Sequence, residues 1–131
     1  MNRRTALAAL ATPLALGAGP SSSKAGRQLA HMVFFTLKER SEDGRKAFVA
    51  LCDKYLSGHP GVVYFSVGTI AEDAIEPGVG VRDFDVALHL VFDDKEAKEN
   101  YLKSTRHDGF VAEIKALVGQ VRVYDSYLAV K

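Results

Sequence analysis

Four histidines and one tyrosine are the residues of this 131-residue chain best suited to carry chemistry. His107 lies at a predicted break between two helices, and Tyr101 precedes it by six positions. The positive end of a helix dipole disfavours imidazolium, so a histidine at a helix N-terminus can act as a neutral base. A neutral base and a phenol in one pocket can remove a proton beside a carbonyl group and hold the developing oxyanion. The spacing equally fits a structural role for His107 as the N-cap of the second helix.

The other histidines lie on three separate predicted elements. His31 is on the first strand, on a face that looks toward the helices, where a lone polar group must find a partner or line a cavity. His59 precedes a Pro-Gly turn and is expected to be an exposed loop residue. His89 lies on the opposite face of the sheet and is expected to be a hydrogen-bonded interface residue. A substrate pocket between sheet and helices is predicted to be lined by His31, Val33, Phe35, Leu88 and Phe110.

No metal ion or cofactor is predicted. The histidines show no H-x-x-x-H spacing, and the single cysteine, Cys52, excludes both an internal disulfide and a C-x-x-C metal motif. Cys52 lies on the apolar stripe of the first helix and is expected to be a core residue. Asp125 is a carboxylate in an otherwise apolar strand, so it needs a partner, either as a structural anchor or as a pocket residue.

Composition indicates one globular domain with no affinity for nucleic acid. The chain is 47% hydrophobic and 25% charged, with a net charge of +1. Arg3, Arg4 and Lys24 fall in the first 25 residues, which contain no acidic residue, so the remaining chain carries 14 basic and 16 acidic residues. A mildly acidic body without a Lys/Arg stripe does not suit phosphate binding.

Residues 1–25 are predicted to be an export signal with a linker. Paired arginines, a short apolar run and then small residues are typical of a secretory signal. The run is well short of the roughly 20 residues that span a bilayer, so no stable membrane span is expected once the signal is removed. Arg3 and Arg4, with Leu7 three residues later, resemble a twin-arginine signal, which implies a periplasmic or secreted protein. A helix at the N-terminus or an uncleaved tether is the alternative.

The body alternates between strand and helix patterns in the order β-α-β-β-α-α-β. Period-two alternation predicts strands over residues 29–38, 62–71, 83–92 and 120–130, and helical periodicity predicts helices over 42–57, from the Asp93 cap to about 103, and over 106–118. This order predicts a ferredoxin-like α+β fold, with helices on one face of a four-stranded antiparallel sheet.

The other face of the sheet would be apolar and uncovered. Strand alternation places there Met32, Phe34, Val62, Tyr64, Ala87, Val91, Tyr124 and Leu128, or their alternating neighbours. An apolar face of that size exceeds what monomers usually expose. A homodimer with the two sheets packed face to face is therefore predicted.

Six segments in order resemble the stress-responsive A/B barrel (Dabb) family. The similarity spans residues 29–128, and the segments are HMVFFTLK at 31–38, PGV at 60–62, DFDVA at 83–87, FDD at 92–94, YL at 101–102 with HDGF at 107–110, and VYDSY at 123–127. The family resemblance implies a ferredoxin-like subunit and a dimeric α+β barrel.

The resemblance also implies two kinds of function. Members include olivetolic acid cyclase, a plant polyketide cyclase, and boiling-stable stress proteins without known catalysis. Tyr101 and His107 match the cyclase's tyrosine and catalytic histidine, and His31 matches its first-strand histidine. The chain departs from the family at residues 104–105, where Ser-Thr replaces the common His-Pro. A dimer that serves protein stability or assembly is expected, with a lyase or cyclase for a small apolar or phenolic ligand as the alternative.

Overall fold

Four strands and three helices make up the fold in the computed structural model, which describes residues 27–129. The predicted export signal lies outside the described residues. The elements are β2 (Leu29–Leu37), α1 (Glu42–Leu56), β3 (Val62–Thr69), the single 3-10 turn η1 (Glu72–Ala74), β4 (Val86–Phe92), α2 (Lys95–Lys103), α3 (Thr105–Ile114) and β5 (Val118–Tyr127).

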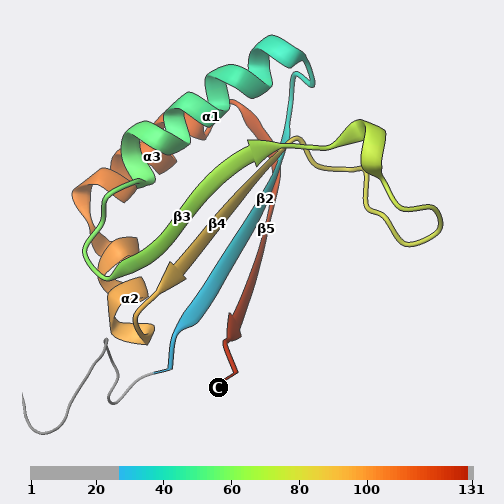
Figure 1. Ribbon diagram of the computed structural model, residues 1–131. Helices are drawn as coiled ribbons and strands as arrows, with labels where there is room; N and C mark the ends of the chain where they lie inside the picture. The colour runs from blue at the N-terminus through green and yellow to red at the C-terminus, as the bar shows by residue number, and fades with distance from the viewer. Residues whose placement is uncertain (1–26, 130–131) are drawn as a thin grey trace, which may run out of the picture.

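The strands form one antiparallel sheet in the order β3-β4-β2-β5. All three helices lie against one face of this sheet, and the β3–β4 loop projects beyond its end (Figure 1). The predicted ferredoxin-like α+β fold, with its second helix broken in two, is confirmed. Among the described residues, no helix combines the length and the apolar character needed to cross a bilayer.

Side-chain caps set where the helices begin. Ser41 accepts a hydrogen bond from the Gly44 amide at 3.0 Å and starts α1, as the sequence predicts. The cap of α2 is Asp94, which accepts from the Ala97 amide at 2.9 Å, so the predicted capping box at Asp93 is wrong by one residue.

Two element boundaries differ from prediction at the end of α3. The helix ends at Ile114 rather than at residue 118, and β5 begins at Val118 rather than at residue 120. The Leu117 amide donates to the Ile114 carbonyl, and the Leu117 carbonyl accepts from the Lys38 amide. These bonds turn the chain into the sheet earlier than the apolar periodicity suggests.

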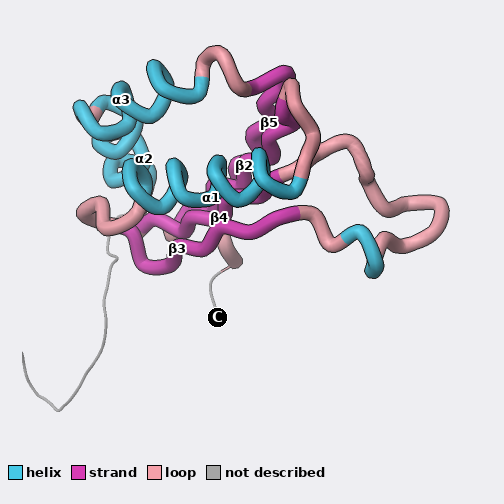
Figure 2. The backbone as a smooth tube through the Cα atoms, turned by 90° about the horizontal axis from the view of Figure 1, so that it is seen from above, coloured by secondary structure: helices cyan, strands magenta, loops and turns pink. Residues whose placement is uncertain are grey.

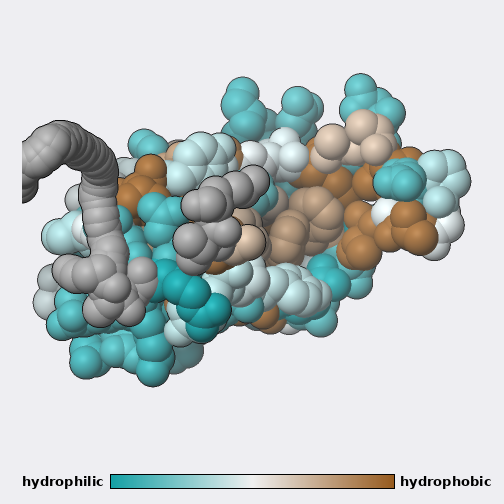
Figure 3. All heavy atoms as spheres, turned by 60° about the horizontal axis from the view of Figure 1, so that its bottom comes forward, coloured by the Kyte–Doolittle hydropathy of each residue, from teal (hydrophilic) through white to brown (hydrophobic). Residues whose placement is uncertain are grey.

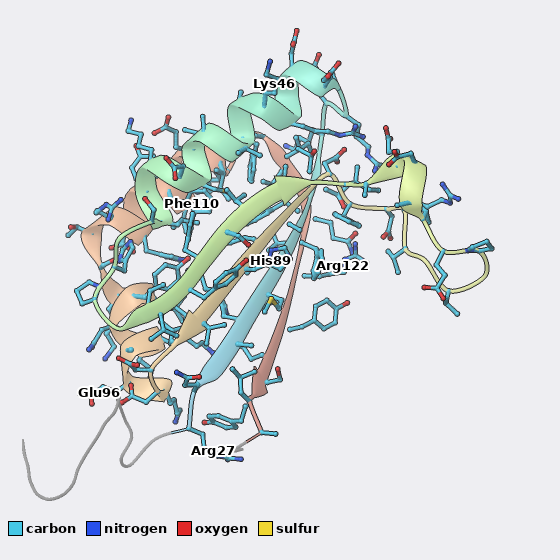
Figure 4. The ribbon with its side chains drawn as sticks, viewed as in Figure 1. Arg27, Lys46, His89, Glu96, Phe110 and Arg122 are labelled. Atoms are coloured by element: carbon cyan, nitrogen blue, oxygen red, sulfur yellow. The ribbon has the colours of Figure 1, made fainter. Side chains whose placement is uncertain are left out.

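The core lies between α1, α3 and the helix-facing side of the sheet. Phe35, Phe48 and Phe110 form an aromatic triangle there, with ring centroids 4.8 to 6.1 Å apart. Figure 4 shows Phe110 between the helices and the sheet. Cys52 is fully buried in this core, as predicted, and burial raises the pKa of its thiol to about 12. The thiolate is therefore suppressed, and Cys52 packs as a small apolar residue.

A bulge in β3 changes the composition of the open sheet face. Val62 and Tyr64 are predicted on the same face, but the register shifts between them. Val62 pairs with Phe92 and packs against the core, whereas Tyr64 pairs with Val91 and is 55% exposed on the other face. The prediction for Val62 is wrong because a bulge inserts one residue and breaks the two-residue alternation.

The start of α1 is joined to the sheet by a buried ion pair network around Asp85. This fully buried carboxylate accepts hydrogen bonds from the Leu37 amide at 2.8 Å, Arg45 Nε at 2.9 Å and Arg40 Nε at 3.1 Å. Burial alone would raise the pKa of Asp85, but these three donors outweigh it and lower the pKa. The network joins α1 to β2 at the end of the sheet that lies away from Tyr101.

Replacing Asp85 with alanine is expected to cost about 3 kcal/mol of unfolding free energy, because it leaves the Leu37 amide and the guanidinium groups of Arg40 and Arg45 without their acceptor. Since the folded pKa is lowered, the contribution of Asp85 is present above the ordinary pKa of about 3.9 and is lost as pH falls through the folded value. Urea denaturation at several pH values measures both the loss of unfolding free energy and its dependence on pH. Asp83→Ala, which removes an exposed pair with Arg122, is the control and should cost less than about 1 kcal/mol. A cost for Asp85→Ala no larger than the control's would contradict the structural role.

Candidate functional site

Tyr101 lies at the centre of a cluster of three histidines. It is on the inner face of α2 and is only 2% exposed. Its ring centroid is 4.9 Å from His107, 4.9 Å from His59 and 6.0 Å from His31. Residues from β2, the α1–β3 turn, α2 and α3 thus converge on one phenol.

The break between α2 and α3 brings Tyr101 and His107 together. Ser104 makes the break: its hydroxyl donates to the Tyr101 carbonyl at 2.8 Å and accepts from the His107 amide at 3.1 Å. Ser104 is therefore the N-cap of α3, and His107 lies in its first turn. The alternative of His107 as N-cap is wrong, because the hydroxyl three residues earlier fills that role.

His31 is hydrogen-bonded to Asp125, the strand carboxylate for which the sequence analysis names no partner. His31 Nδ1 lies 2.6 Å from Asp125 Oδ1, across the β2–β5 register, and Lys98 Nζ of α2 lies 2.9 Å from Asp125 Oδ2. Burial alone would raise the pKa of Asp125, but the bonds from His31 and Lys98 outweigh it and lower the pKa. An ionised carboxylate only accepts hydrogen bonds, so Nδ1 of His31 donates, and Nε2 is the nitrogen that carries the lone pair whenever the ring is neutral.

His59 is the member of the cluster that the sequence analysis misses. It is predicted to be exposed but is 7% exposed, and its Nε2 donates to the Tyr55 carbonyl at 2.8 Å. The turn folds back because Gly58 and Gly61 adopt φ of +74° and +82°. A Cβ on Gly61 would lie 2.5 Å from the Ala97 Cβ, so this glycine lets the turn lie directly against α2. Gly58 and Gly61, on either side of His59, are the sequence signal from which a tight turn that buries His59 could have been predicted.

Burial keeps the phenol of Tyr101 protonated and favours the neutral form of the His107 imidazole. Burial raises the pKa of Tyr101, so its hydroxyl remains a donor. Burial is also the main cause that lowers the pKa of His107; His31 and His59 add to the effect and Asp108 opposes it. A protonated phenol beside a neutral imidazole is the pair that proton abstraction beside a carbonyl requires.

A cleft of about 560 Å³ opens beside His59 and Tyr101, between the α1–β3 turn and α2, and neither His31 nor His107 borders it. Its walls are His59, Pro60, Gly61, Asp93, Asp94, Glu96, Ala97, Asn100, Tyr101 and Ser104. The five predicted lining residues do not border this cleft: Val33, Phe35, Leu88 and Phe110 are buried in the filled core, and His31 is buried beside Asp125. Within residues 27–129, no three histidine, cysteine, aspartate or glutamate side chains are arranged so that they could hold one metal ion.

Comparison with known proteins places the chain in a family. The sequence profile of the Stress responsive A/B Barrel Domain (Dabb) matches residues 29–128. The chain belongs to the Dabb family. No functionally curated protein matches the sequence.

Solved structures share the fold of this Dabb domain. A Dabb family protein with a ferredoxin-like fold from Mesorhizobium loti is 26% identical, with a TM-score of 0.65 over 80% of this chain and 99% of its own. A dimeric ferredoxin-like protein of unknown function from Thermobifida fusca is 14% identical (TM-score 0.64, 85% and 100% covered). A hydroxynitrile lyase from Passiflora edulis is 19% identical (TM-score 0.63, 79% and 95% covered).

His107 is expected to make the domain sensitive to mild acid. Because its folded pKa is lowered, stability is complete at neutral pH and is lost as pH falls through the ordinary value near 6.5 toward the folded value. Thermal melts of His107→Ala between about pH 7.5 and pH 5 should show a smaller acid loss than wild type. Ser41→Ala, which removes the cap of α1, is the control, since it should cost about 1 kcal/mol at every pH without changing the slope. An unchanged acid slope in His107→Ala would reject a buried neutral imidazole.

Proposed function

We propose that this Dabb domain is a homodimer that binds a small organic molecule beside Tyr101 and transfers a proton in lyase- or cyclase-type chemistry. The observation that carries this proposal is the buried phenol in contact with three imidazoles, one of them backed by Asp125. A packed core has no need of such a cluster, because each buried polar group adds a desolvation cost.

The roles follow from protonation. His107 is the proton acceptor, since burial favours its neutral form. Tyr101 donates its hydroxyl to the oxygen on which negative charge develops. His31, oriented by Asp125, presents Nε2 as a second nitrogen that can accept and return the proton.

Part of β5 offers an apolar wall for the rest of the ligand. Val121 and Val123 pair with Phe35 and Val33, so they face the helix side of the sheet. They are nevertheless 46% and 48% exposed, because the helices pack mainly on β3 and β4. Figure 2 shows β5 lying apart from α3, whereas Lys98 of α2 reaches Asp125 of β5. An aromatic or aliphatic body can rest on these valines, close to Asp125 on the same strand. The lyase among the structural neighbours and the resemblance to a polyketide cyclase support this class of reaction.

The direct test is carbon–hydrogen exchange on a simple aromatic ketone. Acetophenone in D2O should lose its methyl proton signal faster with the wild-type domain than with buffer, followed by ¹H NMR. His107→Ala should reduce the enzymatic rate by about 100-fold or more, the usual contribution of a general base. Tyr101→Phe should reduce it as well, and His89→Ala, outside the cluster, should not. A wild-type rate equal to that of buffer would reject proton transfer on ketones.

The open sheet face supports the homodimer. Tyr64 and Tyr124 are 55% and 57% exposed on this face, with Met32 and Phe34 beside them. In Figure 3, apolar residues gather toward the right, over the sheet and the β3–β4 loop. Arg122, opposite Phe34 in the register, has a buried Nε without a hydrogen-bond partner in the part of the chain that the structure describes. A second subunit would cover the apolar area and could supply that acceptor, and the Thermobifida fusca neighbour is dimeric.

Met32→Asp should convert the dimer to monomers, because the new carboxylate would be buried and unpaired in the interface at a cost of several kcal/mol. Analytical ultracentrifugation measures the change. Leu102→Asp, on the exposed side of α2, is the control and should leave the dimer intact. A Met32→Asp dimer of wild-type affinity would mean that another face mediates association.

A second candidate is a non-catalytic dimer that serves protein stability or assembly. It is favoured by the core between sheet and helices, in which Val33, Phe35, Leu88 and Phe110 are buried. This candidate predicts dimerisation without exchange on acetophenone.

We also propose that residues 1–25 direct export by a twin-arginine-like route and are then removed. The support is Arg3-Arg4 followed by the short apolar run. N-terminal sequencing of the exported protein should begin between Ala18 and Gly26. An intact Met1 in the periplasm would contradict removal.

A further inference from the structure

The β3–β4 loop, residues 70–85, holds apolar side chains out to solvent. Val79 is 73% exposed, more than any other large apolar side chain of the described residues, and Val81 is 52% exposed. Both lie in the part of the loop that projects beyond the end of the sheet (Figure 1). Such a pair is of little note alone, but it gains meaning where it extends a larger apolar surface.

The turn that carries the two valines is well defined. The Gly80 amide donates to the Glu76 carbonyl at 2.8 Å, and Gly78 adopts a φ of +82°. A Cβ on Gly80 would lie 2.6 Å from Ile75 Cγ2, so the backbone closes tightly on itself at this point. A preformed segment loses little conformational entropy when it binds a partner. The loop is therefore suited to present its apolar residues to another surface.

The base of the loop belongs to the open sheet face. The ring of Phe84 packs edge to face on Phe34 at 5.2 Å, and Phe34 packs in the same way on Tyr124 at 5.8 Å. Asp83 accepts a hydrogen bond from Arg122 Nη2 at 2.9 Å, which ties the loop to β5. The apolar surface thus continues from the sheet through Phe84 into the loop, and Figure 3 shows apolar side chains over both.

The sheet face alone is small for a stable dimer. With strands about 4.8 Å apart and about 3.4 Å per residue, its four strands and the seven residue pairs of β2 and β4 span roughly 450 Å² in plan. Each partner in a stable interface buries about 800 Å². The loop supplies further apolar surface directly beside this face, where a second subunit can reach it.

Charge disfavours a lipid surface as the partner of the loop. Residues 70–85 contain five carboxylates and a single cation, Arg82. The anionic headgroups of a membrane would repel this segment. A second copy of the chain brings an apolar face without such a charge layer.

We propose that the β3–β4 loop is an arm of the homodimer, which packs Val79 and Val81 against the second subunit beside its sheet face. Two-fold symmetry makes the contact reciprocal, so each subunit gives one arm and receives one. The dimer then buries four valines in addition to the two sheet faces. This inference rests on the homodimer of the proposed function and names the segment that extends its interface.

Replacing both valines tests the arm. Val79→Ser with Val81→Ser should raise the dimer dissociation constant about tenfold or more, because four apolar side chains lose their burial. Analytical ultracentrifugation measures the constant, and a thermal melt checks that the fold is kept. Val111→Ser with Leu117→Ser is the matched control: it removes two side chains that are 48% and 44% exposed outside the open face, and should leave the constant unchanged.

NMR on dimers mixed from labelled and unlabelled subunits gives the direct readout. The methyl groups of Val79 and Val81 should show intermolecular NOEs to the other subunit. Absence of these NOEs, or wild-type affinity in the valine variant while Met32→Asp is monomeric, would overturn the arm and leave the homodimer standing. A monomeric wild type would reject the homodimer and the arm together. Sedimentation with phosphatidylglycerol vesicles that the valine variant loses would assign the loop to lipid and overturn the proposal.

Discussion

A buried imidazole needs a hydrogen-bond partner, and the site is arranged around that need. His31 stands on a strand face whose other members are apolar, and it is 5% exposed. Asp125 on the neighbouring strand accepts a hydrogen bond from the His31 ring, and Lys98 of α2 donates one to Asp125. One chain of contacts therefore joins β2 and β5 to α2, the helix that carries Tyr101. Without it, the imidazole would be a destabilising group in an apolar layer.

Two local features of the backbone bring His107 and His59 to Tyr101. Ser104 ends one helix and starts the next, so His107 comes back against the phenol six residues before it. Gly58 and Gly61 turn the chain tightly enough for His59 to reach the same ring. The Asp85 network lies at the other end of the sheet and stabilises the fold without entering the site. The molecule thus separates a filled, aromatic core from a polar end that opens to a cleft.

The alternation of apolar residues was sufficient to predict the sheet, the helices and the family, because each strand buries one face. It could also place Tyr101 beside His107, since both flank one helix break. It could not place His59, because burial of a turn residue depends on contacts with a helix about forty residues later. It could not detect the bulge before Tyr64, which moves Val62 into the core. The partner of Asp125 was equally hidden, since only the β2–β5 register brings His31 opposite it.

The measurement that most directly tests the organisation of the site is the protonation of the His31 ring. Long-range ¹H–¹⁵N NMR at neutral pH distinguishes the two tautomers. The structure predicts that the neutral ring of the wild type carries its proton on Nδ1 and not on Nε2, because Asp125 accepts from Nδ1. Asp125→Ala should release the ring to a tautomer mixture, and Glu99→Ala, a carboxylate of α2 that pairs with Lys95, should not. A neutral wild-type ring with its proton on Nε2 and not on Nδ1 would contradict the Asp125-oriented imidazole on which the account depends.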